Sequence, residues 1–123
     1  MILIVDDNKS LLYSLKNVLT GLGYEVCCVK EPARALKMVR DLTGKSSPPE
    51  VLITDLRMPE ICGTELIRQC RQVCPGLATI LMTAYGEEKI KETVAAMERS
   101  RYLEKPFTVY RLIALIDELK TLH

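Results

Sequence analysis

The sequence is poor in several residue types and patterns on which common functions depend. Among its 123 residues the one histidine is His123, and the five cysteines form no CxxC pair, so a Cys/His zinc site is not expected. The net charge is only +1, which gives no basic footprint for nucleic acid or for a membrane surface. No apolar run approaches the roughly 20 residues of a membrane-spanning helix, and no signal peptide is recognisable. These absences favour a soluble protein of the cytoplasm.

The cysteines are the second feature that limits the choice of function. In a reducing compartment, small thiols of this kind are usually buried and unpaired, which is the interpretation we favour for Cys27, Cys28, Cys62, Cys70 and Cys74. The alternative concerns Cys70 and Cys74, which lie four residues apart on a predicted helix and could ligate a metal. We expect instead that one of the two faces the core and the other lies near the helix end.

Length and composition indicate one globular domain over residues 1–123. The chain is 48% hydrophobic and 27% charged, values typical of a protein that buries a substantial core. We find no internal repeat, no low-complexity tract and no second domain in it.

The N-terminal stretch Ile2 to Asn8 organises the rest of the chain. Ile2 to Val5 form a short, continuous apolar run, which is typical of a strand buried on both faces of a parallel sheet. Asp6 and Asp7 follow directly, at the carboxyl end of that strand, where open α/β sheets bind their ligands. Two adjacent carboxylates repel each other unless a cation or a positive side chain compensates them.

Strand and helix patterns alternate along the remaining chain. The strand patterns cover residues 2–5, 24–29, 51–53, 78–82 and 102–103. The helix patterns run from residue 9 to the glycines at 21 and 23, and over about 32–42, 64–73, 87–99 and 109–122. This alternation predicts a doubly wound parallel α/β sheet with helices on both faces. Gly21 and Gly23 follow the first helix, so they are no dinucleotide-binding loop, which would precede it.

Four of the five predicted strands end in a residue whose side chain can bind a ligand or take part in a reaction. These residues are Asp6-Asp7, Asp55, Thr83 and Lys105, and the carboxyl ends of parallel strands meet at one edge. Each alone has an ordinary explanation: a helix cap for the aspartates, a turn hydroxyl for Thr83, a surface charge for Lys105. Their agreement favours a shared site, and its hard oxygen ligands suit Mg²⁺.

The ordered set of motifs resembles the CheY-like receiver domains of two-component response regulators over essentially the whole chain. The motifs are Asp-Asp after the first strand, D-x-x-M-P-x-x-x-G at 55–63, Thr83-Ala84, and Y-L-x-K-P-F at 102–107. The strings TAYG and YLEKPF are most similar to the receivers of NtrC-like transcription regulators. The resemblance implies a flavodoxin-like (βα)5 sheet of strand order 2-1-3-4-5, with the site at its switch point.

The resemblance also implies a metal site and a phosphoacceptor. Asp55 would accept the phosphoryl group from a histidine kinase or a histidine phosphotransfer protein. Asp7 and Asp55 would ligate Mg²⁺ through their side chains, Asp6 through water, and Arg57 through its backbone carbonyl. Such a protein is a signalling switch rather than a turnover enzyme, because it catalyses only its own phosphorylation and dephosphorylation.

The same resemblance implies a route from the site to an output surface. Thr83 and Lys105 would bond the phosphoryl oxygens, and the shift of Thr83 would let Tyr102 turn inward. That turn would remodel the face made by the fourth helix, the fifth strand and the fifth helix. Lys105-Pro106 is a plausible cis peptide bond. An attached output domain and a homodimer that forms on phosphorylation are further expectations for the family.

Three features depart from the family pattern. The loop at 43–50 is longer than usual, and the segment MERSRY lacks the Gly-Ala that usually precedes the fifth strand, which leaves the end of the fourth helix open. Arg57 and Tyr85 occupy the two variable positions beside the site. A bulky Tyr85 would shield the acyl phosphate from water and give a long-lived phosphoryl state.

Two other functions compete with the switch. A receiver-shaped binding module regulated without phosphate would not need Asp6, Asp7, Asp55, Thr83 and Lys105 together. A Mg²⁺-dependent phosphohydrolase with an aspartyl nucleophile usually carries D-x-D-x-T after a strand, whereas Asp55 is followed by Leu-Arg.

Overall fold

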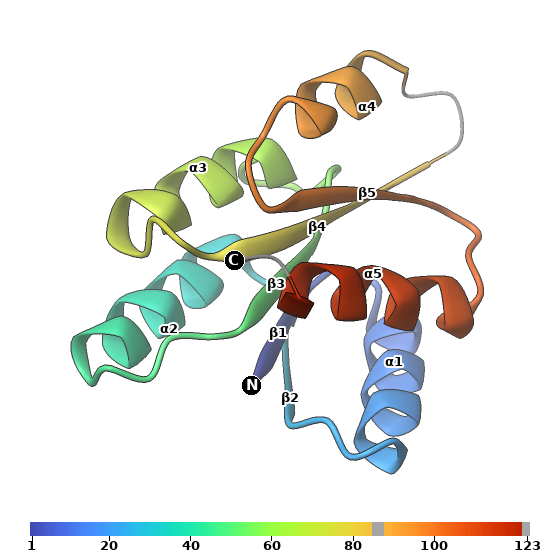
Figure 1. The fold of residues 1–123 in the computed structure, drawn as a ribbon, viewed down its shortest axis with the longest axis horizontal. Coiled ribbons are helices and arrows are strands. Elements are labelled where there is room, and N and C mark those ends of the chain that lie inside the picture. Colours follow the sequence, from blue (N-terminus) through green and yellow to red (C-terminus); the bar gives the residue numbers. More distant parts are fainter. Residues whose placement is uncertain (85–87, 122–123) are drawn as a thin grey trace.

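Alternating strands and helices build a three-layer α/β structure in the computed structural model, which describes residues 1–84 and 88–121 (Figure 1). The strands are β1 (Ile2–Val5), β2 (Val26–Val29), β3 (Val51–Asp55), β4 (Ala78–Thr83) and β5 (Ser100–Glu104). The helices are α1 (Lys9–Gly21), α2 (Pro32–Gly44), α3 (Gly63–Val73), α4 (Glu88–Ala95) and α5 (Val109–Thr121). The strands pair in parallel in the order β2-β1-β3-β4-β5, which confirms the predicted flavodoxin-like fold.

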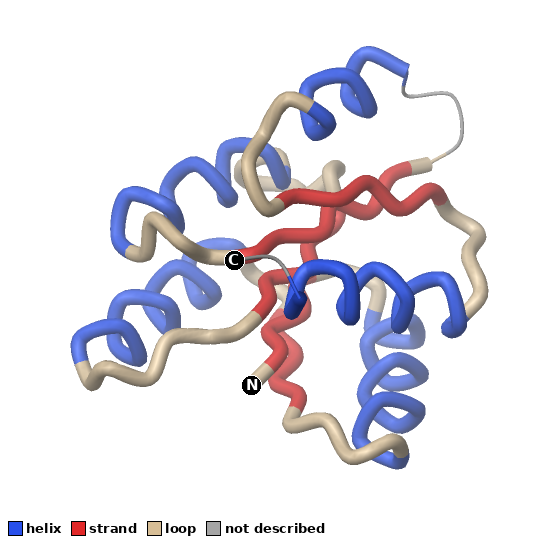
Figure 2. Tube along the Cα trace, viewed as in Figure 1, coloured by secondary structure: helices blue, strands red, loops and turns tan. Residues whose placement is uncertain are grey.

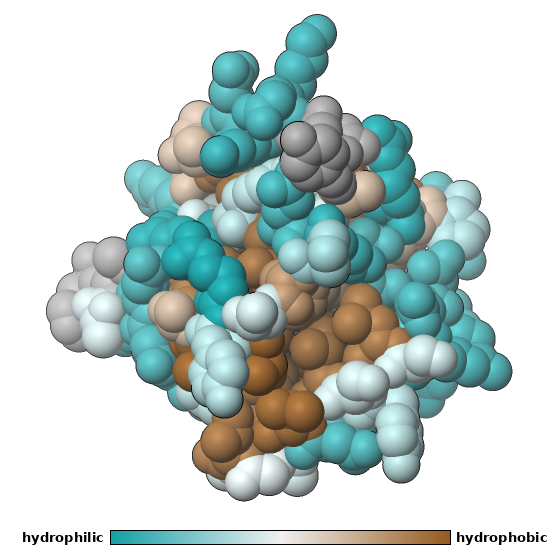
Figure 3. Space-filling view, turned by 90° about the vertical axis from the view of Figure 1, so that its right-hand side faces the viewer, coloured by the Kyte–Doolittle hydropathy of each residue, from teal (hydrophilic) through white to brown (hydrophobic). Residues whose placement is uncertain are grey.

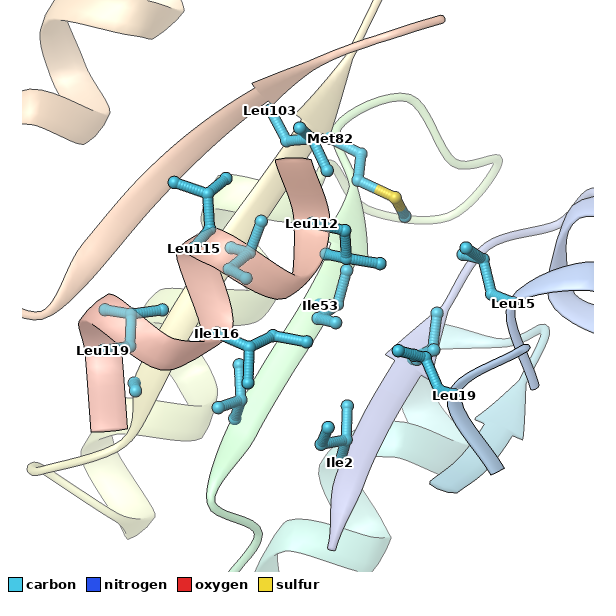
Figure 4. Close-up of a cluster of buried hydrophobic side chains, with 14 of the residues drawn as sticks. Ile2, Leu15, Leu19, Ile53, Met82, Leu103, Leu112, Leu115, Ile116 and Leu119 are labelled. Atoms are coloured by element: carbon cyan, nitrogen blue, oxygen red, sulfur yellow. The ribbon is translucent and has the colours of Figure 1, made fainter. Parts of the chain in front are cut away.

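The helices cover the two faces of the sheet unequally (Figure 2). On one face, α1 and α5 pack their apolar side chains onto alternate residues of the strands, among them Ile2, Ile53 and Met82 (Figure 4). On the other face, α2, α3 and α4 pack onto the intervening residues, such as Leu3, Leu52 and Leu81. The central strands are therefore buried on both sides, as the continuous apolar runs predicted.

The structure corrects the prediction at the junction between α4 and β5. The helix ends at Ala95 rather than near residue 99, because the chain tightens there into a turn in which Met97 N donates to the Val94 carbonyl at 3.0 Å. Arg99 then adopts a positive φ of 51°, a conformation that favours glycine. The departure from the family pattern therefore lies at a backbone position where glycine would be unstrained. β5 is longer than predicted and begins at Ser100.

Other differences are small and do not affect the strand ends. β2 begins at Val26 rather than at residue 24, and α2 continues to Gly44, which shortens the predicted loop after it. Cys70 is buried in the core, and Cys74 forms the C-cap of α3, in agreement with the expected division between the two thiols. Burial raises the pKa of the Cys70 thiol to about 12.

Candidate functional site

The carboxyl ends of β1 and β3 bring three aspartates together. Val5 lies opposite Thr54 in the sheet register, so the residues that follow, Asp6 and Asp55, leave neighbouring strands at the same level. Oxygen atoms of Asp6, Asp7 and Asp55 all lie within 4.8 Å of one another. The structure thus brings together three of the residues that the sequence assigned to a metal site.

Asp6 is the buried member of this cluster. Its side chain is only 1% exposed. One of its oxygens accepts a hydrogen bond from the backbone N–H of Asn8 at 2.9 Å, and the other lies 2.8 Å from Lys105 Nζ. The first bond is an Asx-turn, which also leads the chain into α1, where the Asn8 side chain caps the helix through Leu11 N. Both oxygens of Asp6 therefore already have a partner.

Asp55 is less well compensated than Asp6. Its Oδ1 lies 3.5 Å from Lys105 Nζ, farther than the 2.8 Å between the same nitrogen and Asp6. Burial raises the pKa of the Asp55 carboxyl, Lys105 lowers it, and the charges of Asp6 and Asp7 raise it again, so that the pKa lies above its usual value. The three carboxylates of the cluster therefore carry more negative charge than the ammonium of Lys105 offsets.

This donor set fits Mg²⁺. The cluster offers carboxylate oxygens only, which are the ligands that a hard divalent cation prefers, and Asp7 is exposed at its rim. A cation would relieve the repulsion from Asp6 and Asp7, which adds to the effect of burial in raising the Asp55 pKa. Arg57 lies in the loop that follows β3, where its backbone carbonyl remains a predicted ligand.

Lys105 reaches the site from β5. It follows the last residue of that strand, Glu104, and its backbone N–H donates to the Thr83 carbonyl at 2.7 Å, which extends the pairing of β4 with β5. The Lys105–Pro106 peptide bond is cis, as the sequence suggested.

Thr83 and Tyr102, the two residues predicted to form the switch, lie on the face of the sheet that carries α3 and α4. Met82 belongs to the core between the sheet and α1 and α5, so the alternation of β4 directs Thr83 to the face that carries α3 and α4. The Thr83 hydroxyl is buried and has no hydrogen-bond partner among the described residues. Tyr102 packs against the core of the same face. Tyr85 lies outside the described residues.

An apolar groove opens beside the site on the face of α1 and α5. Its lining includes Leu11, Val18, Pro106 and Phe107, and it reaches Lys105 at one end. In a view from this side of the molecule, hydrophobic surface is gathered in and around the hollow (Figure 3).

Two residues that contact the backbone of Asp55 were missed by the sequence analysis. From the sequence Thr54 has no predicted role, and Gly63 appears only as the last residue of the motif at 55–63. A polar residue within the apolar run of β3 was the one available signal for Thr54. For Gly63 the motif gives the spacing from Asp55, but the need for a glycine there depends on its closeness to the Asp55 carbonyl, which the sequence does not give.

Comparison with known proteins agrees with this geometry. The family model described as the response regulator receiver domain matches residues 2–117. The chain is 36% identical over 116 residues to the DNA-binding transcriptional regulator NtrC of Klebsiella pneumoniae, covering 93% of this chain and 23% of that protein. It is 33% identical over 120 residues to the response regulator MprA of Mycobacterium ulcerans, covering 96% of this chain and 49% of that protein. The chain thus spans half or less of these relatives.

A solved structure supports the same conclusion. The response regulator receiver domain protein from Clostridium thermocellum superposes with a TM-score of 0.83 at 28% identity, covering 96% of this chain and 91% of that one. Within residues 1–84 and 88–121, no helix combines the length and apolar character needed to cross a membrane. The family match extends over nearly the whole chain and agrees with its fold and its acidic cluster, so this chain belongs to the response regulator receiver domain family.

Proposed function

We propose that residues 1–123 form one phosphoacceptor receiver domain in which Asp55 takes up a phosphoryl group. The observation that carries the proposal is the cluster of Asp6, Asp7 and Asp55 at the sheet edge, with Lys105 Nζ placed between Asp6 and Asp55. Phosphoryl transfer requires a nucleophile in line with the leaving group and positive charge near the phosphoryl oxygens. Asp55 supplies the first requirement and Lys105 part of the second.

The donor is a phosphohistidine of a histidine kinase or a histidine phosphotransfer protein. A carboxylate oxygen of Asp55 forms a bond to phosphorus while the bond from phosphorus to the imidazole nitrogen breaks. The electron pair of that bond stays on the imidazole, which then takes a proton, and Asp55 becomes a mixed anhydride. Because the acceptor attacks as a carboxylate, no base is needed to activate it.

Mg²⁺ completes the proposed site. Asp7 and Asp55 would hold the ion through their side chains, Arg57 through its backbone carbonyl, and Asp6 through water. Asp6 already accepts hydrogen bonds from Asn8 N–H and from Lys105. When bound, the ion neutralises charge on the aspartates and on the phosphoryl oxygens. Lys105 provides a fixed positive charge beside it, and with Thr83 it would bond the phosphoryl group.

The output of the switch is the face of α4, β5 and α5. Thr83 has a buried hydroxyl without a described partner, so a bond to the phosphoryl group would satisfy a group that is unsatisfied in the present structure. Movement of Thr83 would change the packing around Tyr102 on the same face of the sheet. A coupling free energy of about 1–3 kcal/mol would bias such a two-state element.

The proposed setting is a two-component pathway in the cytoplasm. NtrC and MprA are both longer than this chain, and NtrC is described as a DNA-binding transcriptional regulator. An attached output domain, a role in transcription and a homodimer formed on phosphorylation therefore belong to the proposal. The chain would act as a switch that catalyses only its own phosphorylation and dephosphorylation.

Incubation with acetyl phosphate and Mg²⁺, followed by intact-mass spectrometry, tests the proposal. The wild type should gain one phosphoryl group, and Asp55→Asn should gain none. Asp117→Asn, which changes an aspartate on α5, serves as the matched control and should behave as wild type. Chelation of Mg²⁺ should abolish the gain. Equal incorporation by wild type and Asp55→Asn, or none by wild type, would remove Asp55 as the phosphoacceptor.

A further inference from the structure

The peptide group that follows Asp55 is held by a hydroxyl from the opposite face of the sheet. Thr54 is fully buried, and its Oγ1 donates a hydrogen bond to the Asp55 carbonyl oxygen at 3.0 Å. The same Oγ1 lies 3.9 Å from the Met58 sulfur, in the loop that follows β3. Because neighbouring side chains of a strand point to opposite faces, the Thr54 side chain points away from the Asp55 carboxylate. Its contacts are with the backbone and the loop.

Gly63 closes around the same carbonyl group. A Cβ at Gly63 would lie 2.3 Å from the Asp55 carbonyl oxygen and 2.6 Å from Leu81 Cδ1, so no other residue fits without displacing the backbone of Asp55. Gly63 N donates to the Leu56 carbonyl at 2.8 Å, and Leu56 N donates to the Met82 carbonyl at 2.8 Å. The loop over residues 56–62 is therefore bonded to β4 at its start, and Gly63 bonds the end of the loop back to that start.

We propose that Thr54 and Gly63 are positioning residues of the metal and phosphoryl site. They fix the orientation of the peptide after Asp55, and so the direction in which the loop leaves β3 with the Arg57 carbonyl. This inference rests on the proposed function, because it concerns how the chain presents its predicted Mg²⁺ ligands. Groups that orient metal ligands without touching the metal commonly affect metal affinity strongly.

If Thr54 had a purely structural role, its replacement would lower stability without a specific effect on Mg²⁺ affinity. Thr79 is a control that distinguishes these two effects. Thr79 is also fully buried in the sheet, and its hydroxyl is also hydrogen-bonded, at 2.6 Å to Ser100 Oγ. It lies at the start of β4, at the edge opposite the site. Thr54→Val and Thr79→Val therefore remove the same group from equally buried positions, and only the first lies next to Asp55.

The experiment compares Mg²⁺ binding by titration calorimetry and the Mg²⁺ dependence of phosphorylation by acetyl phosphate. Thr54→Val should weaken Mg²⁺ binding by about threefold to tenfold, the span that one net hydrogen bond is worth. It should raise the Mg²⁺ concentration for half-maximal phosphorylation by the same factor. Thr54→Ser keeps the hydroxyl and should restore both values, whereas Thr79→Val should lower the melting temperature and leave Mg²⁺ affinity unchanged.

Gly63→Ala tests the second contact and has its own control. It should weaken Mg²⁺ binding at least as much as Thr54→Val, whereas Gly76→Ala, where a Cβ meets nothing within 4 Å, should not. Adding Leu81→Val to Gly63→Ala relieves the contact with Cδ1 but not the one with the Asp55 carbonyl, so the weak binding should persist.

The outcomes separate this inference from the proposed function. A wild type that binds Mg²⁺ and becomes phosphorylated, with Thr54→Val and Thr54→Ser both at wild-type affinity, would overturn the inference and leave the proposed function standing. Recovery of full affinity in the Gly63→Ala, Leu81→Val double variant would overturn the part assigned to Gly63. A wild type that neither binds Mg²⁺ nor takes up phosphate would overturn both.

Discussion

Replacing Arg71 should destabilise the fold more than replacing any exposed arginine of the same helix. From the last turn of α3, the Arg71 guanidinium donates to the Leu77 carbonyl at 2.9 Å from Nη2 and at 3.2 Å from Nε. It also reaches the Glu98 carbonyl, the Arg99 carbonyl at 3.2 Å and Ser100 Oγ at 3.0 Å. One side chain thus joins α3, the start of β4 and the turn that leads into β5.

The magnitude follows from the number of N–H groups rather than from the number of contacts. Nε carries one hydrogen and Nη2 carries two, so the contacts share three donors, each worth about 1 kcal/mol net. Burial lowers the pKa of the Arg71 guanidinium, which shows that partial desolvation opposes this gain. For Arg71→Met we therefore expect a loss of about 2–3 kcal/mol. In a domain of this size that corresponds to a fall in Tm of about 6–12 °C.

Urea unfolding followed by circular dichroism measures this loss, and Arg68→Met is the matched control. Arg68 lies one turn earlier on α3, its side chain is 57% exposed, and its partner Glu65 belongs to the same helix. Exposed pairs of this kind are worth less than about 0.5 kcal/mol, so the control should stay close to wild type. If Arg71→Met unfolds within 0.5 kcal/mol of Arg68→Met, the contacts of Arg71 do not hold the junction as argued.

Four further results are expected. Without Mg²⁺ at pH 7, the free energy of unfolding of Asp55→Asn should exceed that of wild type by about 1 kcal/mol, because one like charge leaves the cluster. A urea midpoint lower than that of wild type would contradict this. Under the same conditions Lys105→Met should be less stable by about 1–2 kcal/mol, and an unchanged midpoint would show that its ion pairs are not stabilising. Hydrogen bonding to Thr64 lowers the pKa of the Cys62 thiol below its usual 9.0. Alkylation of Cys62 should therefore reach half its maximal rate at a lower pH in wild type than in Thr64→Val. Equal midpoints in the two proteins would refute this. Val18 lines the apolar groove beside the site, which a protein donor would contact and acetyl phosphate would not. Val18→Asp should therefore slow phosphoryl transfer from a protein donor and leave transfer from acetyl phosphate unchanged. Slowing of both would show damage to the site rather than to the groove.

The strand ends were predictable because the physics that places them is local. The apolar runs of β1, β3 and β4 end abruptly at a polar residue, and a parallel sheet aligns such ends whatever the connecting helices do. Asp6, Asp55 and Lys105 could therefore be assigned to one edge from sequence. In the structure Lys105 Nζ lies 2.8 Å from Asp6 and 3.5 Å from Asp55.

What could not be predicted depends on contacts between distant parts of the chain. The end of α4 and the start of β5 are set by a left-handed Arg99 and by hydrogen bonds from Arg71, which no periodicity reveals. The face on which Thr83 lies was also hidden, because β4 is apolar on both sides and its alternation carries no polarity. The reason for a glycine at Gly63 appears only when the distance to the Asp55 carbonyl is known.

The placement of these residues on two faces limits how the proposed switch can work. Lys105 lines the groove beside α1, and the alternation of β3 directs the Asp55 side chain to the same face as Ile53, whereas Thr83 and Tyr102 lie on the side of α3 and α4. The sheet between them is filled with fully buried side chains, and a core packed in this way does not deform gradually. In the proposed switch, a phosphoryl group on Asp55 therefore reaches Thr83 at the carboxyl end of β4, where Lys105 N is also bonded to the Thr83 carbonyl. The sheet edge that gathers the charges is then also the edge at which the proposed switch would connect the two faces.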